Sequence, residues 1–404
     1  MATCARPEMP AILIDISRLL FRRFAKRLPT GIDRVSIEYL RRYKGAARAV
    51  LSYGGLHVVL PMAASTRLFA LLSDESAAPL WREVLPLLVA IGKGALAEGD
   101  LRGAILFNTG HMGLGDGRYA EGLRRRGVRP VFMVHDLIPI THPEYCRAGE
   151  MEKHGKRMRN VLSMAHGIIA NSADTLFHLT AFADAQGRRL PPAVVAPLAP
   201  GATAAPAGAR PMAEPYFVVL STIEPRKNHL MLLQLWRRMA QTRGAGAPRL
   251  VIIGQRGWEC ENVVDMLERC APLQGLVFEY SRCSDAELAT FLHHAEALLF
   301  PSFVEGYGMP LIEALAAGVP VIASDLAVFR EFAADIPEYA DPLDPQRWLA
   351  LVDAYSEPRS TKRQAQRERL RHFHLPTWGQ HFACTDALLT ALDPASEKRL
   401  GDVD

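Results

Sequence analysis

Short apolar runs alternate along the chain with longer segments whose apolar residues recur at helical spacing. In the first half the runs lie at 11–17, 48–53, 57–60, 104–108, 130–136 and 167–172. In the second half they lie at 216–222, 249–254, 276–280, 297–302 and 319–324. This alternation of buried strands with helices is typical of doubly wound parallel sheets, so we predict an α/β protein with two Rossmann-like domains.

Residues 196–215 interrupt the alternation. The segment is dense in Ala, Pro and Gly and has almost no core residues, which predicts a linker. We therefore expect an N-terminal domain over 1–197, a linker over 198–215, a C-terminal domain over 216–376 and a final helix and tail over 377–404. The last helix, an amphipathic candidate, either caps the second domain or crosses back to the first. Ligands of open parallel sheets bind at the carboxyl ends of the strands, so two facing domains would form a cleft there.

Residues 300–318 (FPSFVEGYGMPLIEALAAG) carry the clearest chemical signal. A buried strand leads into a Gly-rich turn, and a helix is expected to start at Pro310 and to stop at Gly318. The N-terminus of a helix presents unpaired N–H groups and the positive end of the helix dipole. The arrangement therefore predicts a site for a phosphate-bearing ligand.

Two carboxylates, Glu305 and Glu313, lie in this stretch. An ionised carboxylate only accepts hydrogen bonds, so both residues suit a ligand that is rich in sugar hydroxyls. Set in the pattern PS-x-x-EGYG-x-P-x-x-EA-x-x-x-G, the pair resembles the retaining glycosyltransferases of family 4, which have the GT-B fold. The alternative is a turn Glu and a solvated Glu at a helix start.

The resemblance implies that Glu305 lies near the transferred sugar and that Glu313 binds the ribose of the nucleotide. It also implies that the turn of Gly306, Tyr307, Gly308 and Met309 belongs to the donor-binding site, and that a C-terminal helix crosses back to the first domain. The resemblance is dense over 216–345 and rests on architecture in the first half.

Arg226 and Lys227 follow the strand at 216–222, where two cations can hold a diphosphate and offset its charge as it leaves. The family pattern has an Arg directly after the strand and a Lys five residues later. Lys227 keeps the lysine, whereas Thr222 stands where the arginine is expected, so Arg226 is the natural substitute. The sequence TIEPRKN is similar to the corresponding segment of mannosyltransferases in the family.

Four polar residues and one glycine of the first half are further candidates. In PTGIDRV (29–35), Gly31 allows the close backbone approach to the donor phosphates that the family's loop makes; the alternative is a plain helix start with Thr30 as N-cap. His135 and Asp136 end the strand at 130–136, and the resemblance implies that this His contacts the transferred sugar; a structural core His is the alternative. The strand at 104–108 ends in Asn108, which with His111 and Asp136 gives acceptor-side candidates.

Residues 276–292 resemble the segment that holds the base in the family. Cys283 would lie beside the ring, while Ser284 and Glu287 have the spacing of a capping box, which gives Glu287 a structural role.

Composition and charge restrict the partners. The chain of 404 residues is 49% hydrophobic and 22% charged, has no apolar run long enough to span a membrane and starts with a short polar segment, so we expect a soluble protein without a secretory signal. Six scattered cysteines indicate reduced thiols and therefore a cytoplasmic protein.

Basic residues are concentrated between Arg18 and Arg48, around the segment SRLLFRRFAKRL. This segment either lies on an anionic membrane or beside a lipid diphosphate, or it packs on its own domain. No base-stacking pattern accompanies the charge, so nucleic acid is disfavoured.

No metal is expected, because the D-x-D pair Asp402–Asp404 is at the frayed C-terminus. Arg226, Lys227 and a helix N-terminus would replace a cation at the diphosphate. The resemblance implies a front-face transfer that retains the anomeric configuration. We expect a hexosyltransferase that uses GDP-mannose in preference to a UDP-sugar. Its expected acceptor is an oligosaccharide or a polyprenyl-diphosphate-linked saccharide of a surface polysaccharide. We expect the enzyme in the cytoplasm, peripherally bound to the inner face of the cytoplasmic membrane. One alternative is a non-catalytic nucleotide-sugar-binding scaffold. Another is an epimerase or phosphorylase of the same fold, but a phosphorylase needs pyridoxal phosphate and the sequence has no motif for binding it.

Overall fold

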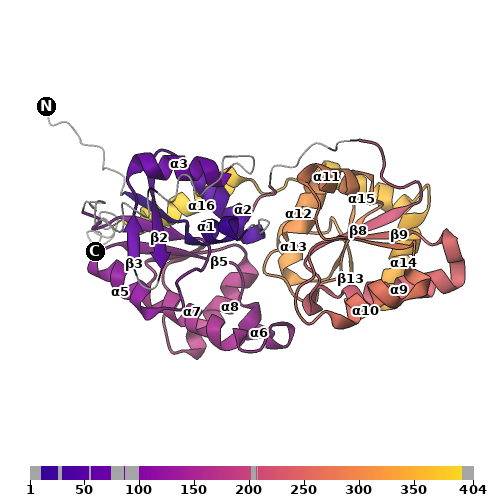
Figure 1. Cartoon of the computed structure of the whole chain (residues 1–404), viewed down its shortest axis with the longest axis horizontal. Helices are drawn as coiled ribbons and strands as arrows, with labels where there is room; N and C mark the ends of the chain where they lie inside the picture. The colour runs from indigo at the N-terminus through magenta and orange to yellow at the C-terminus, as the bar shows by residue number, and fades with distance from the viewer. Residues whose placement is uncertain are drawn as a thin grey trace, which may run out of the picture.

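The computed structural model of the protein describes residues 11–25, 30–53, 56–73, 86, 100–201, 206 and 208–393. Within these ranges the chain forms two lobes that lie side by side, each built around its own sheet (Figure 1). Lys26, Arg27, Pro29, Asp402 and Asp404, which the sequence interpretation used, lie outside the described residues.

The first sheet has the strand order β3-β2-β1-β4-β5-β6-β7. Its strands are β1 (Ile12–Asp15), β2 (Ala47–Tyr53), β3 (Leu56–Val59), β4 (Ile105–Asn108), β5 (Arg129–Val134), β6 (Gly167–Ala170) and β7 (Ala193–Val195). The helices of this lobe are α1 (Ser17–Phe24), α2 (Gly31–Arg42), α3 (Met62–Ser73), α5 (Gly117–Arg125), α6 (Ile138–Thr141), η1 (Pro143–Tyr145), α7 (Glu150–Met164) and α8 (Ala173–Ala185). Helices α1 to α3 share one apolar cluster with the sheet, and α5, α7 and α8 share another, so both faces are covered.

The first sheet departs from the expected all-parallel pattern at one edge. Strands β2 and β3 pair antiparallel, with Val50 opposite Val59. Only two residues separate the two strands along the chain, and so short a connection can join only antiparallel neighbours. A single antiparallel edge strand is a common addition to a parallel sheet.

The second sheet has the order β10-β9-β8-β11-β12-β13, and its recorded pairings are parallel. Its strands are β8 (Tyr216–Leu220), β9 (Arg249–Ile253), β10 (Val277–Tyr280), β11 (Leu298–Phe300), β12 (Val321–Ser324) and β13 (Glu338–Ala340). Its helices are η2 (Pro225–Lys227), α9 (His229–Arg243), η3 (Gly244–Gly246), α10 (Glu261–Arg269), η4 (Ala271–Leu273), α11 (Asp285–His294), α12 (Met309–Ala316), α13 (Ala327–Ala333), α14 (Pro345–Ser356) and α15 (Thr361–Arg371). The predicted fold, two Rossmann-like domains, is confirmed.

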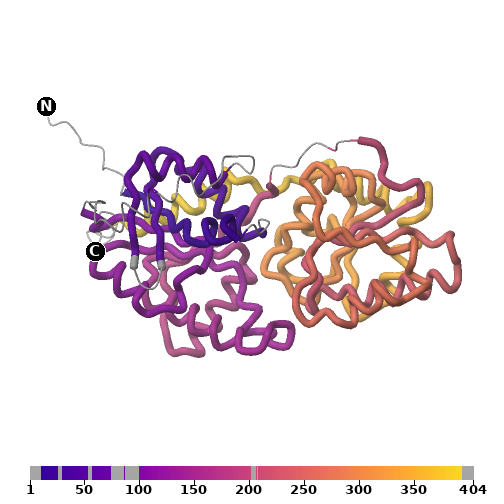
Figure 2. Tube along the Cα trace, viewed as in Figure 1, coloured from indigo at the N-terminus to yellow at the C-terminus, as the bar shows by residue number. Residues whose placement is uncertain are grey.

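The last helix, α16 (Trp378–Ala391), packs on the first lobe, as the resemblance implied. Figure 2 shows the yellow end of the chain returning from the second lobe to lie along the indigo one. The Tyr39 hydroxyl lies 2.9 Å from Nε2 of His381, whose Nδ1 lies 3.1 Å from the carbonyl oxygen of Ala196. Phe382 and Leu388 complete the contact by joining the apolar cluster of the first sheet.

The segment expected to be a linker begins inside the folded core. Leu198 is only 2% exposed, and the hydroxyl of Tyr307 donates a hydrogen bond to its carbonyl oxygen at 2.6 Å. The passage between the lobes is therefore packed at its start.

Candidate active site

The strand, turn and helix of the predicted phosphate site form as the sequence indicates. Strand β11 ends at Phe300, α12 begins at Met309 with Pro310 in its first turn, and Gly318 has a φ of 71° just after the helix. Gly308, at the N-cap of α12, has a φ of 107°, and a Cβ atom there would meet the ring of Phe329. Glycine is required at this turn for both reasons.

Glu305 lies in this turn and is buried, with 7% of its surface exposed. One carboxylate oxygen accepts hydrogen bonds from Lys227 Nζ and from Ser302 Oγ (2.7 Å), and the other accepts from Arg226 Nη1 (2.8 Å). Burial by itself raises the pKa of Glu305, but the charges of Arg226 and Lys227 and the hydrogen bonds outweigh it and hold the pKa at about 2. The carboxylate is therefore ionised at neutral pH.

Arg226 and Lys227 reach Glu305 from the short helix η2, which follows β8. Arg226 also pairs with the buried Glu224, so two cations face two carboxylates. Burial and the charge of Arg226 lower the pKa of Lys227, against the attraction of Glu305 and Glu224. The pair of cations is thus set beside the Gly-rich turn, where a diphosphate was expected; their phosphate contact stays a prediction.

Glu313, in α12, faces the first lobe. Its Oε1 lies 2.7 Å from Nη1 of Arg34, in α2, and Nη2 of the same arginine lies 3.4 Å from Asp285. Burial raises the pKa of Glu313, and the charge of Arg34 opposes this rise. The sequence interpretation assigned no role to Arg34; its only signal was its place in the loop PTGIDRV.

Both interpretations of Gly31 are compatible with the structure. The capping box of Thr30 and Asp33 starts α2 at Gly31. A Cβ atom at Gly31 would also lie 3.5 Å from the side chain of Met309, at the beginning of α12. The helix start thus lies against the second lobe at the predicted donor site.

Gly306 lies in close contact with the first lobe. A Cβ atom there would overlap the carbonyl oxygen of His135 and lie 2.6 Å from Cβ of Asp136. The hydroxyls of Ser172 and Thr175 donate to the carbonyl oxygen of Gly306 at 3.3 Å. His135 and Asp136 are therefore brought next to the residue that follows Glu305.

His135 is buried, and its Nε2 lies 2.7 Å from the carbonyl oxygen of Thr109. Burial lowers its pKa, so the imidazole is neutral at pH 7. The backbone hydrogen bond fixes the tautomer, as expected for a histidine that presents its other nitrogen to a ligand. Oδ1 of Asp136 accepts a hydrogen bond from the N–H of Ile138 at 3.0 Å.

Asn108, predicted on the acceptor side, has hydrogen-bond partners within the first lobe. Its Oδ1 accepts from the N–H groups of Gly110 and His111, and its Nδ2 donates to the carbonyl oxygen of Met112 and to the Tyr119 hydroxyl. The side chain of Asn108 thus fixes its own loop and ties it to α5, and its contact with an acceptor stays a prediction. The φ of His111 in this loop is 60°.

Tyr307 and Cys283 have mainly structural surroundings. Tyr307 is buried, stacks on Phe332 and donates a hydrogen bond to the carbonyl oxygen of Leu198, and its contact with a donor stays a prediction. Burial, and then the charges of Glu287 and Asp285, raise the pKa of Cys283 to about 11, so its thiol is protonated. The capping box of Ser284 and Glu287 is confirmed.

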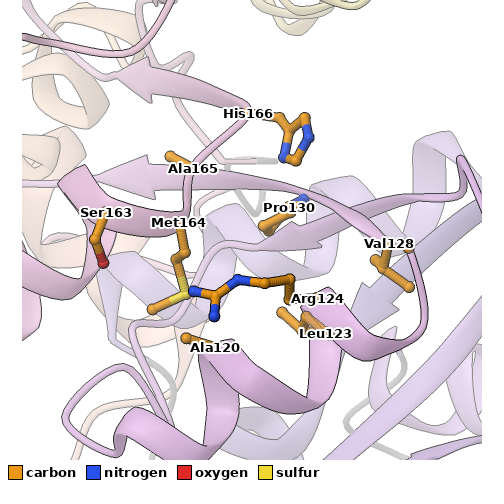
Figure 3. A pocket seen from close by; sticks show the side chains of 10 residues that line it. Ala120, Leu123, Arg124, Val128, Pro130, Ser163, Met164, Ala165 and His166 are labelled. Atoms are coloured by element: carbon orange, nitrogen blue, oxygen red, sulfur yellow. The ribbon is translucent and has the colours of Figure 1, made fainter.

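Two further features were searched for in the described residues: clusters of metal ligands and pockets. The described residues contain no cluster of three or more His, Cys, Asp or Glu side chains that could hold a metal ion. A pocket of about 360 Å³ lies between α5 and α7, lined by Arg124, Pro130 and His166 among others (Figure 3). Pro130 and His166 are at the amino ends of β5 and β6, the sheet edge opposite His135, so this pocket belongs to another part of the fold.

None of the described helices is long and apolar enough to cross a lipid bilayer.

Comparison with known proteins gives the site its context. Residues 203–371 match the family model of glycosyl transferases group 1. The serotype-specific mannosyltransferase WbdA of Escherichia coli is 30% identical over an alignment 275 residues long, which covers 59% of this chain and 32% of that protein. The O-antigen chain mannosyltransferase B of Escherichia coli is 28% identical over 55% of this chain and 60% of its own length. The chain thus spans about a third of the length of the first of these relatives.

Solved structures extend the likeness to the whole chain. HepE of Anabaena, solved with UDP and glucose, has a TM-score of 0.60 at 14% identity and covers 98% of this chain and 100% of its own. The α,α-trehalose 6-phosphate synthase of Burkholderia multivorans has a TM-score of 0.60 at 14% identity, over 96% and 99% of the two chains. Residues 203–371 are therefore similar to glycosyl transferases group 1, and the chain as a whole has the GT-B fold of these solved structures.

Proposed function

We propose that the chain is a metal-independent glycosyltransferase that moves a hexose, preferably mannose, from a nucleotide sugar to a saccharide acceptor with retention of configuration. The observation that carries the proposal is the buried, ionised Glu305, held by Arg226 and Lys227 next to Gly306, where the two lobes are in close contact. The similarity to glycosyl transferases group 1 and the mannosyltransferase relatives support a sugar transfer in polysaccharide synthesis.

The residues take these roles in the proposed reaction. The bond between the anomeric carbon and the phosphate oxygen breaks, and Arg226 and Lys227 stabilise the charge that develops on the diphosphate. The acceptor hydroxyl attacks from the same face and gives its proton to the departing phosphate oxygen. Glu305 orients the sugar and keeps the two cations in place, and Glu313 exchanges its Arg34 partner for the ribose hydroxyls.

The first experiment is a thermal-shift panel with GDP, UDP, ADP and their hexose conjugates, with and without EDTA. Stabilisation by GDP that survives EDTA supports the metal-free mannosyl donor. Stabilisation by UDP keeps the fold and changes the donor. No shift with any nucleotide favours the non-catalytic scaffold.

Two variants and the product then test the chemistry. Lys227→Ala should lower turnover most, and Glu313→Ala should weaken nucleotide binding. If both stay within about twofold of the wild type, which is under 0.5 kcal/mol of barrier, the site is misassigned. A β-linked product from an α-linked donor, seen by proton NMR, would contradict retention.

We also propose that the acceptor is carried on a lipid and that α1 faces the cytoplasmic membrane. Phe21 and Phe24 of α1 are 57% and 50% exposed, which supports an apolar contact. Asp33 pairs with both Arg18 and Arg22, so part of the positive charge predicted for this segment is already compensated. Co-sedimentation with anionic vesicles should fall in Phe21→Ser/Phe24→Ser and be unchanged in Phe177→Ser, a control whose side chain in α8 is 68% exposed.

A further inference from the structure

Three imidazole rings lie together on the first lobe, beside the contact with Gly306. His135 directly follows β5, His111 is in the loop after β4, and His154 is on α7. The ring centroids of His111 and His135 are 5.4 Å apart, and those of His111 and His154 are 6.1 Å apart. The ring of His111 therefore lies next to both of the other two.

Each ring is held in the same way. Nε2 of His111 lies 2.6 Å from the carbonyl oxygen of Met133, and Nε2 of His154 lies 3.1 Å from that of Asp136. Nε2 of His135 makes the corresponding contact with Thr109. A carbonyl oxygen can only accept, so the hydrogen of each neutral ring is on Nε2 and each Nδ1 keeps its lone pair.

The three Nδ1 atoms are acceptors without a donor from the protein. No described residue donates a hydrogen bond to them, although His135 and His154 are only 6% and 5% exposed. Burial lowers the pKa of all three imidazoles, so a second proton does not occupy Nδ1 at neutral pH. None of the three is among the fully buried side-chain atoms that lack a partner, so each Nδ1 is open to a donor from outside the protein.

The loop that carries His111 is built to hold this residue in an uncommon conformation. The φ of His111 is 60°, a left-handed backbone for a residue with a Cβ atom. Asn108 bonds the N–H groups of Gly110 and His111 and the carbonyl oxygen of Met112, which fixes the loop around the ring. Strained positions of this kind persist where the surrounding contacts enforce them, often at ligand sites.

We propose that His111 and His154 form the binding subsite for the acceptor sugar, whose hydroxyls donate hydrogen bonds to their Nδ1 atoms. The inference rests on the proposed transferase function, because it assigns the sugar that lies across from the donor at Glu305. Neutral acceptor nitrogens suit an uncharged saccharide, which offers several O–H donors. His135, between His111 and Gly306, marks the boundary with the transferred sugar.

Replacing His154 by Gln or by Asn can distinguish a binding role of this histidine from a purely structural one. In His154→Gln the side-chain amide nitrogen can keep the bond to the Asp136 carbonyl, while the Nδ1 acceptor is lost. In His154→Asn an oxygen takes the place of Nδ1, while the bond to the carbonyl is lost. A binding role predicts that Gln is the damaging change, and a structural role predicts that Asn is.

The test measures saccharide binding and nucleotide binding separately. Saturation-transfer NMR with a panel of methyl hexosides should show binding to the wild type and to His154→Asn, and at least fivefold weaker binding to His154→Gln. In the transfer assay, His154→Gln should raise the acceptor KM about tenfold and leave the donor KM within twofold. His111→Gln and His111→Asn should repeat the pattern.

Each contrary result has one meaning. If no methyl hexoside binds the wild type, or if the Asn variants lose binding and the Gln variants keep it, the subsite is overturned. If hexosides bind as expected but calorimetry finds no nucleotide or nucleotide sugar bound to the wild type, the transferase proposal fails and the saccharide site stands.

Discussion

Arg34 in the first lobe and Glu313 in the second form an ion pair that joins the lobes, with Nη1 2.7 Å from Oε1. The two residues are 279 positions apart in the chain, and Glu313 is the carboxylate proposed to bind ribose. The same ion pair therefore links the two lobes and engages the carboxylate that would otherwise bind the ribose.

Arg34→Glu should open the molecule. The change places a negative charge against Glu313 and Asp285, so the lobes should separate, and small-angle scattering should show a larger radius of gyration. Arg41→Glu is the matched control, because Arg41 lies on the same helix and pairs with Glu38 within that helix. Identical scattering curves for the two variants would show that the ion pair does not set the separation.

Gly306→Ala should prevent the close approach of the lobes. The added methyl group would overlap the carbonyl oxygen of His135, which is backbone and cannot rotate away. We expect turnover to fall more than tenfold, because displacements of about 1 Å can cost up to about a hundredfold in rate. Gly115→Ala is the control, since a Cβ atom there meets nothing within 4 Å. Equal turnover in both variants would contradict the closed arrangement of the site.

Acid should destabilise the protein in part through Glu305. The pKa falls from 4.5 to about 2 on folding, so its stabilisation is complete above pH 4.5 and is lost as the pH falls toward 2. The difference corresponds to about 3 kcal/mol. Urea unfolding between pH 7 and pH 3 should therefore show a steeper loss for the wild type than for Glu305→Gln. Parallel pH profiles would show that folding does not lower the pKa of Glu305.

Gln366 should matter for stability far more than its neighbours on α15. It is fully buried, and its amide bonds the N–H and carbonyl of Val321, the carbonyl of Ile336 and the Tyr355 hydroxyl. Gln366→Leu leaves these buried groups unpaired and should cost about 2–4 kcal/mol. Gln364→Leu, on the exposed face of the same helix, should change the free energy of unfolding by less than about 0.5 kcal/mol. Comparable losses in the two variants would refute this role.

The strands were predictable where their pattern was strong. The runs that become β1, β5 and β8 are buried on both faces and read as continuous apolar stretches. Strands β7 and β13 have three residues each and lie at sheet edges, so their sequences give no such signal. Periodicity also gives no strand direction, which is why the antiparallel pairing of β3 was missed.

The part of the candidate site that lies within one continuous segment could be predicted from the sequence. Glu305 and Gly308 belong to a local strand–turn–helix pattern, and the turn has the expected backbone. The Arg34 partner of Glu313 depends on how two domains face each other, and local sequence does not encode that arrangement. The same holds for His154, whose spacing on α7 gives no indication of the Asp136 carbonyl that fixes its ring.

Helix α16 has a consequence for how the protein is made. It is formed by residues 378–391 but supplies Phe382 and Leu388 to the core of the first lobe. A ribosome finishes the sheet of that lobe nearly two hundred residues before it produces this helix. The lobe that is synthesised first is therefore completed last, and until then its apolar face beside Tyr39 is open to chaperones.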